Sequence, residues 1–181
     1  FLVLQDEVLP LLFEQRKRIR LWSVSCSTGE EAVSLAVLAR NEKKKKPGRD
    51  FTVFASDINT DVLDQLKSGS FGVHSFRSDG SEFHDLLRDS SISTSNGSGG
   101  IKISEEIMSN ISVHPVNLLK DSFDFLNEPV DLIFFRNTLL YMALEKRPLL
   151  LKLLAKMLSP GGFMYLASSE VPFVSLPELE L

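Results

Sequence analysis

Polar side chains follow three apolar runs of the chain, and each polar group begins where its run ends. The runs are residues 19–25, 51–56 and 132–135, and the polar groups are Ser-Cys-Ser-Thr-Gly-Glu-Glu at 25–31, Asp57, and Arg136 with Asn137. Short apolar runs of this kind are typical of buried strands. Because ligands bind at the carboxyl ends of the strands in an open parallel sheet, we expect the three groups to face one site.

The apolar pattern alternates between strand-like and helix-like stretches. Strands are predicted at 19–25, 51–56, 113–116, 132–135 and 163–167, and helices at 5–14 (interrupted at Pro10), 30–40, 60–68 and 145–158. Thr60 is the expected N-cap of the third helix, and Pro148 is expected in the first turn of the fourth. Residues 41–50 are typical of a polar turn, and 159–162 of a helix break. Apolar strands separated by helices predict a doubly wound, mostly parallel, Rossmann-like α/β sheet.

Residues 71–110 do not follow this alternation. A Ser/Gly-rich stretch at 90–100 between short apolar segments indicates an inserted β-subdomain or flap. The predicted division is therefore a tail of an N-terminal helical segment at 1–18, a ligand-binding domain at 19–70 and 111–181, and the insertion between them. Because the chain opens at Phe1 and not at Met, we expect it to begin inside a longer protein.

The first polar loop, 25–31, restricts the class of ligand. Small residues and Gly29 let a ligand approach the backbone. The loop has one glycine where a dinucleotide fingerprint needs three, which disfavours a nicotinamide oxidoreductase. Glu30 and Glu31 would repel a pyrophosphate at the start of the following helix. A ligand with a ribose and a positive group fits better, and S-adenosylmethionine (SAM) has both and carries no phosphate.

The other two polar groups each have a purely structural alternative. An acid at the position of Asp57 commonly accepts hydrogen bonds from ribose hydroxyls. Alternatively Asp57 caps the next helix, although Asn59 or Thr60 is better placed for that. Arg136 and Asn137 either face the ligand or act locally, with the arginine paired to a surface acid and the asparagine capping a turn. The spacing leaves both open.

Composition argues against several other classes. The net charge of −4 disfavours a nucleic-acid binder. One cysteine and three scattered histidines offer no metal-ligand spacing, so no metal site is predicted. Cys26 is expected to be a small packed residue, and a lone cysteine fits a reducing, cytoplasmic location. No apolar run approaches the roughly 18 residues that a membrane span needs, so no membrane insertion is expected.

Four motifs stand in order along the chain. They are Leu21-Trp22-Ser23 with Cys26-Ser27-Thr28-Gly29-Glu30-Glu31, then Phe54-Ala55-Ser56-Asp57-Ile58-Asn59-Thr60, then Val116-Asn117-Leu118-Leu119, and finally Phe135-Arg136-Asn137-Thr138-Leu139-Leu140-Tyr141. Together they resemble the SAM-binding domain of the CheR-type chemotaxis-receptor methyltransferases. The resemblance runs over essentially the whole chain.

The resemblance implies a class I SAM-dependent methyltransferase fold, with SAM as the methyl donor and S-adenosylhomocysteine (SAH) as its product. The implied acceptor is a glutamate side chain of a chemoreceptor protein, which becomes a methyl ester. By motif position, Glu31 and Asp57 would contact the cofactor, with Asp57 at the ribose. Asn117 and Leu118 would flank the adenine.

The remaining roles also follow from the resemblance. Arg136 and Asn137 would close over the cofactor, and Tyr141 matches a tyrosine near the transferring methyl group, so Tyr141 and Arg136 are the candidate catalytic residues. Ser27 and Gly29 complete the expected cofactor-binding set. The insertion at 71–110 matches a small antiparallel subdomain that docks a receptor tail in some members.

The chain departs from the family at two places. Ala32-Val33 stands where Pro-Tyr is usual, and Ala167-Ser168-Ser169-Glu170 where Gly-His-Ser-Glu is common. These departures motivate an alternative function, a non-catalytic signalling module that binds SAM or SAH. A small-molecule acceptor is a further alternative, because only the resemblance implies a protein acceptor. The family also has a helical domain before the position of Phe1 and two strands after that of Glu170.

Overall fold

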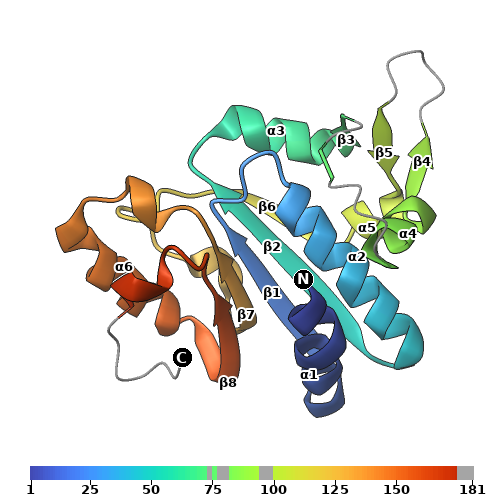
Figure 1. The fold of residues 1–181 in the computed structure, drawn as a ribbon, viewed down its shortest axis with the longest axis horizontal. Helices are drawn as coiled ribbons and strands as arrows, with labels where there is room; N and C mark the ends of the chain where they lie inside the picture. The colour runs from blue at the N-terminus through green and yellow to red at the C-terminus, as the bar shows by residue number, and fades with distance from the viewer. Residues whose placement is uncertain (73–74, 77–81, 94–99, 175–181) are drawn as a thin grey trace.

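In a computed structural model of the chain, five parallel strands form the main sheet (Figure 1). The structure describes residues 1–72, 75–76, 82–93 and 100–174. The strands are β1 (Arg18–Val24), β2 (Asp50–Asp57), β6 (Ile111–Pro115), β7 (Val130–Phe135) and β8 (Leu158–Tyr165), and their order is β6-β2-β1-β7-β8. The predicted doubly wound, Rossmann-like sheet is therefore confirmed. The strand order reverses between β1 and β7, so the carboxyl ends of these two strands border the switch point.

Helices on both faces of the sheet bury alternate residues of each strand. The helices α1 (Leu9–Gln15), α2 (Glu30–Lys45) and α3 (Thr60–Ser68) contribute to one core, and α6 (Arg147–Ala155) contributes to the other. On β1, Leu21 belongs to the first core and Trp22 to the second, and on β7 Phe134 and Phe135 divide in the same way. Because successive side chains of a strand point to opposite faces, two apolar layers enclose the sheet.

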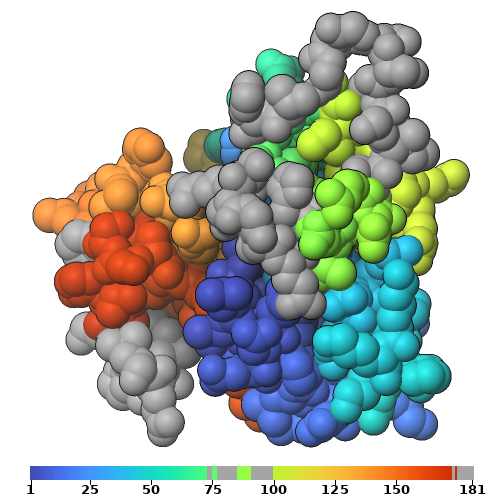
Figure 2. All heavy atoms as spheres, turned by 45° about the vertical axis from the view of Figure 1, so that its right-hand side comes forward, coloured from blue at the N-terminus to red at the C-terminus, as the bar shows by residue number. Residues whose placement is uncertain are grey.

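A second sheet of three antiparallel strands lies beside α2. Its strands are β3 (Ser70–Phe71), β4 (Ser91–Ser93) and β5 (Ile101–Ile103) in the order β3-β5-β4, with α4 (Glu82–Asp89) and α5 (Glu105–Met108) next to them (Figure 1). Figure 2 shows the atoms of α4 against those of α2. Phe71, Leu87 and Ile107 are buried in the same core as α2. Much of the predicted Ser/Gly-rich loop, residues 94–99, lies outside the described residues. The division of the chain into domains stays a prediction.

Two helix boundaries differ from the prediction. α2 continues to Lys45, through half of the predicted polar turn, because buried Glu42 pairs with Lys45 at 3.0 Å and lysines stabilise the carboxyl end of a helix. α6 occupies only Arg147–Ala155 of the predicted 145–158, after a 3-10 turn η4 (Leu144–Lys146). Pro148 lies in its first turn, as predicted.

The predicted helix break at 159–162 is instead part of β8. Leu158 pairs with Val130 and Phe163 with Leu132, so the intervening residues bulge from the ladder. Gly162 fits there because a Cβ atom would lie 3.0 Å from the carbonyl oxygen of Asp131. The bulge lets β8 start five residues earlier than its apolar pattern indicates.

The N-terminal helix is not interrupted at Pro10, contrary to the prediction. It begins as a π turn, η1 (Leu4–Val8), and continues directly into α1 with Pro10 in the first turn. Proline has no N–H to donate to the turn before it. The N–H of Leu9 donates to the carbonyl of Leu4, five residues earlier, as in a π turn.

Candidate functional site

The carboxyl ends of β1 and β2 are joined through their following loops. The backbone N–H of Ser27 donates to Oδ2 of Asp57 at 2.9 Å, and the N–H of Cys26 donates to the carbonyl of Ser56 at 2.9 Å. Loop 25–29 therefore lies against the end of β2. The sequence expectation that these two polar segments meet at one rim of the sheet agrees with this geometry.

Asp57 does not cap the following helix. Its Oδ1 accepts from the N–H of Asn59 at 3.0 Å, whereas Asn59 itself is the N-cap of α3 and accepts from the N–H of Asp61 at 2.9 Å. The prediction of Thr60 as the cap was wrong, because Thr60 is already the first helical residue. Asp57 remains half-exposed, and each carboxylate oxygen has a further lone pair, so it can still accept hydroxyl groups.

Loop 25–29 has an unusual backbone. Ser25, Ser27 and Gly29 have positive φ values of 55°, 50° and 94°, a region that side chains other than glycine disfavour. The open side of Gly29 faces α3, where an added Cβ atom would lie 2.4 Å from Cδ1 of Leu66. The absence of a side chain at Gly29 thus lets α2 begin against α3. Any contact of Gly29 with a ligand would come from its backbone.

Glu31 and Arg136 meet across the switch point. Nη1 of Arg136 lies 3.6 Å from Oε2 of Glu31, and Ser23 Oγ donates to Oε1 of Glu31 at 2.8 Å. Burial raises the pKa of Glu31, while the hydrogen bond from Ser23 and the charge of Arg136 act in the opposite direction. The sequence left open whether Arg136 pairs with an acid or faces the ligand. Its partner acid is itself a candidate site residue.

A buried carboxylate holds the loop that follows β7. Glu170 is fully buried, and it accepts from the N–H groups of Asn137 (2.8 Å), Leu139 (2.8 Å) and Ala167 (3.1 Å). Asn137 has a φ of 59°, so the chain turns sharply as soon as β7 ends. Sequence reasoning gave Glu170 no role, because all three of its partners are backbone groups.

The segment after β6 is tied to the same rim. The N–H of Val116 donates to the carbonyl of Asp57 at 2.9 Å, and the N–H of Asn117 donates to Oδ2 of Asp121 at 2.7 Å. This places Asn117 near the end of β2. Leu118, in contrast, is only 8% exposed and packs into the core that contains α6. Little of its side chain is therefore accessible to a ligand at the rim.

Tyr141 differs most from the other candidates. It ends the 3-10 turn η3 (Leu139–Tyr141), and the residue is 88% exposed. Among the described residues, no hydrogen bond holds its hydroxyl against another candidate. The structure thus brings Ser27 to Asp57 and Glu31 to Arg136, whereas Tyr141 stands in solvent and its predicted role near the methyl group stays a prediction.

Cys26 is packed in the fold, as the sequence predicts. It is buried, and this burial, with the nearby Asp57, raises the pKa of its thiol to about 12. The thiolate is the reactive form of cysteine, so Cys26 is an inert part of the loop.

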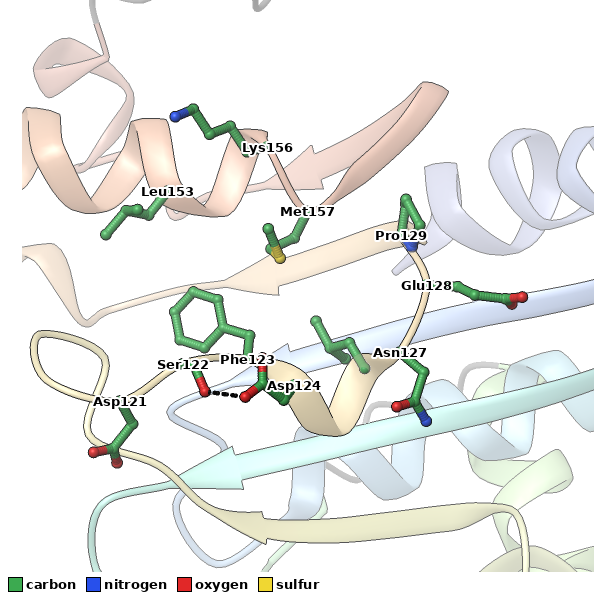
Figure 3. Close-up of a pocket in the computed structure, with 11 residues that line it drawn as sticks. Asp121, Ser122, Phe123, Asp124, Asn127, Glu128, Pro129, Leu153, Lys156 and Met157 are labelled. Carbon is green, nitrogen blue, oxygen red and sulfur yellow. Dashed lines mark hydrogen bonds between the residues drawn. The ribbon is translucent and has the colours of Figure 1, made fainter.

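A pocket of about 640 Å³ adjoins the rim at Asp121, which accepts from the N–H of Asn117, and extends from there along the chain before β7 (Figure 3). Its lining comes from the segment before β7, which contains the 3-10 turn η2 (Asp124–Leu126), and from the end of α6. The lining residues are Asp121, Ser122, Phe123, Asp124, Leu126, Asn127, Glu128, Pro129, Leu153, Lys156 and Met157. Pro129 and Met157 directly precede β7 and β8, so the far end of the pocket reaches the amino ends of these strands.

The described residues lack the features of two other classes of protein. Groups of three or more His, Cys, Asp or Glu that could hold a metal ion do not occur in this part of the chain. Across the same residues, none of the helices has the length and apolar character that crossing a membrane requires.

A family model decides the assignment that the geometry suggests. The model described as "CheR methyltransferase, SAM binding domain" matches residues 1–178. The chain belongs to this family. The resemblance drawn from the four motifs is therefore confirmed, and the cofactor of the family is SAM.

Curated relatives agree with this assignment. The chemotaxis protein methyltransferase of Vibrio anguillarum is 29% identical over 94% of this chain and 60% of its own length. Chemotaxis protein methyltransferase 1 of Pseudomonas aeruginosa is 31% identical over 94% of this chain and 62% of its own length. The chain thus spans about three fifths of these relatives. A solved structure described as a putative O-methyltransferase from Nostoc punctiforme shares the fold, with a TM-score of 0.51, 13% identity, and coverage of 93% of this chain and 40% of its own.

The residues at the rim fit SAM. The half-exposed carboxylate of Asp57 at the end of β2 can accept hydrogen bonds from ribose hydroxyls. Glu31 supplies a negative charge near the switch point, where a sulfonium or ammonium group would be favoured. The fit depends on side chains from three loops that are already hydrogen-bonded to one another or to their neighbours.

Proposed function

We propose that this chain is the SAM-binding domain of an enzyme that methylates glutamate side chains of a chemotaxis receptor. The observation that carries the proposal is the convergence of Asp57, Glu31 and Arg136 at the carboxyl ends of β1, β2 and β7 in a member of this family. The relatives named for chemotaxis methylation support the receptor as acceptor.

The proposed chemistry needs little from the protein beyond positioning. SAM supplies a methyl group on a sulfonium, which a carboxylate oxygen displaces from sulfur to give a methyl ester and neutral SAH. A glutamate has an unperturbed pKa of about 4.3, so the acceptor is already ionised near pH 7 and no general base is required. Well-oriented groups gain on the order of 7–11 kcal/mol from positioning alone.

Each candidate residue then has one proposed task. Asp57 binds the ribose, Glu31 faces the positive end of the cofactor, and Asn117 contacts the adenine. Arg136 orients the acceptor carboxylate, since its distance of 3.6 Å from Glu31 exceeds that of a hydrogen-bonded pair and its side chain is 40% exposed. Tyr141 orients the same carboxylate through its hydroxyl.

Further contacts are proposed for the backbone and side chains of the two flanking loops. Ser27 and Gly29 line the cofactor through the loop after β1, and Asn137 closes over it from the loop after β7. Leu118 supplies the apolar edge beside the adenine.

The alternative, a non-catalytic SAM-binding module, rests on the two departures from the family pattern. Ala32 and Val33 are fully buried in the core at the start of α2. That departure removes the hydroxyl of the usual tyrosine at a position buried in the core, and it leaves Glu31, Asp57 and Arg136 in place, which favours the enzyme over the module. Ala167 still donates its N–H to Glu170.

Transfer of a radiolabelled methyl group to receptor fragments tests the proposal. We expect label on the receptor that is released by mild base, as a glutamate methyl ester requires. Binding of SAM without base-labile transfer would instead establish the signalling module. Label on a small-molecule acceptor alone would contradict the receptor as substrate.

A further inference from the structure

Glu170 joins the two loops that follow neighbouring strands of the sheet. Its Oε2 accepts from the N–H groups of Asn137, after β7, and Ala167, after β8, while Oε1 accepts from the N–H of Leu139. The side chain is fully buried. A buried carboxylate is costly unless its oxygens are satisfied, and here three donors satisfy them.

Two of these donors, Asn137 and Leu139, lie in the turn that directly follows Arg136. Asn137 follows Arg136 directly and holds a φ of 59°, a left-handed conformation that asparagine adopts more readily than most residues. The bonds from Asn137 and Leu139 to one carboxylate fix the turn in this conformation. The guanidinium of Arg136 is thereby held on the side of the turn where it meets Glu31.

We infer that Glu170 is a positioning residue for the cofactor site, acting through Asn137 and Arg136 without touching the ligand. This inference rests on the proposed function, because it assigns the loop after β7 to SAM binding. An amide could not replace the carboxylate: in Glu170→Gln one end of the side chain becomes an NH2 group that faces a backbone donor. One hydrogen bond is then lost and two donors oppose each other.

The test compares Glu170→Gln with Asp131→Asn, a change at another buried carboxylate, which lies on β7. Asp131 lies near the amino end of β7, is 3% exposed, and accepts from the N–H of Arg20 (2.8 Å) and the hydroxyl of Ser159 (2.7 Å). Both E170Q and D131N should lower the thermal unfolding midpoint of the full chain. Only E170Q should weaken SAH binding in calorimetry, by roughly tenfold to a hundredfold, because it alone misplaces a binding loop.

Hydrogen exchange at the amides of residues 136–141 provides the second readout. We expect faster exchange there in E170Q and wild-type exchange in D131N. Equal SAH affinity of E170Q and the wild type, or equal losses in both variants, would overturn the positioning role.

Failure of the proposed function is distinguishable from failure of this inference. If the wild type itself does not bind SAH, the proposed function is wrong, and the exchange at 136–141 still decides whether Glu170 orders the loop. If E170Q does not fold, E170D keeps the charge but withdraws its oxygens by one methylene. It should give a smaller loss of SAH affinity, and unchanged affinity would count against the inference.

Discussion

Arg136 Nη1 lies 3.6 Å from Oε2 of Glu31, so the loop after β7 and the start of α2 present opposite charges to each other across the switch point. Neither charge is neutralised by a close bidentate pair. A ligand with a cation and an acceptor with a carboxylate can therefore each find a partner of opposite sign at this rim.

Replacement of Glu31 by Gln should change the stability of the ligand-free protein and its affinity for SAH in opposite directions. Burial raises the pKa of Glu31 above its ordinary value of 4.5, so the folded protein favours the protonated form more than the unfolded chain does. The stability associated with this group is present below that ordinary pKa and is lost as the pH rises through the folded-state pKa. E31Q should therefore raise the unfolding midpoint of the ligand-free protein at pH 7, while SAH binding weakens roughly tenfold.

The matched control is Glu30→Gln, one residue earlier in the same helical turn. It removes the same charge from the same helix start, and its partner is the hydroxyl of Thr28 at 2.6 Å. E30Q should leave SAH affinity close to that of the wild type. Equal effects of E30Q and E31Q would mean that only the net charge matters and that Glu31 has no specific partner in the ligand.

Asp57→Ala should weaken SAM binding more than Tyr141→Phe. Removing a carboxylate that accepts hydroxyl groups costs about 1.5–3 kcal/mol, or roughly tenfold to a hundredfold in affinity. Tyr141 is 88% exposed, so loss of its hydroxyl should leave affinity unchanged and lower only the transfer rate. Calorimetry that gives the opposite order would show that these two roles are misassigned.

Gly29→Ala should destabilise the fold for two separable reasons. A φ of 94° disfavours any side chain by about 1–2 kcal/mol, and the new Cβ atom would overlap Leu66 at 2.4 Å, which adds about 1–3 kcal/mol. Gly48→Ala is the control, since Gly48 has a φ of 83° but no atom within 4 Å of an added Cβ. Urea unfolding should show a larger loss for G29A than for G48A, and Leu66→Ala should reduce the effect of G29A. Equal losses would exclude the clash.

Cys26 should not react with thiol reagents in the folded protein. With a thiol pKa of about 12 and a buried position, almost no accessible thiolate exists at pH 8. A chromogenic disulfide reagent should therefore titrate no thiol at pH 8 without denaturant and one thiol per chain in it. Rapid native labelling would show that loop 25–29 opens readily.

The sequence predicted the parts of the site that depend on strand ends. Asp57 and Arg136 each follow a continuous apolar run, and parallel strands necessarily bring such ends to one edge. The need for glycine at position 29 was not predictable. It arises from the contact with Leu66 on α3, and the local sequence pattern does not reveal how α3 packs. Glu170 was missed for a similar reason, since its partners are backbone N–H groups about thirty residues away in two cases.

The predicted ends of helices and strands were wrong where packing or a bulge overrides the apolar periodicity of the sequence. Glu42 extends α2 past the last apolar position because its buried carboxylate forms an ion pair with Lys45, three residues later in the helix. Gly161 and Gly162 are typical of a helix break in the sequence, although in β8 they allow a bulge beside Asp131. Glycine pairs have both uses, and only the neighbouring strand decides between them.

Hydrogen exchange with and without SAH tests the central claim most directly, since the pocket of Figure 3 is a different candidate site with which the rim can be compared. We expect SAH to protect amides at 25–31, 57–60, 116–118 and 136–141. The amides at 124–129 and 153–157, which belong to the far part of the pocket of Figure 3, should be unchanged. Protection confined to the pocket segments, or none at the ends of β1, β2 and β7, would contradict a SAM site at this rim.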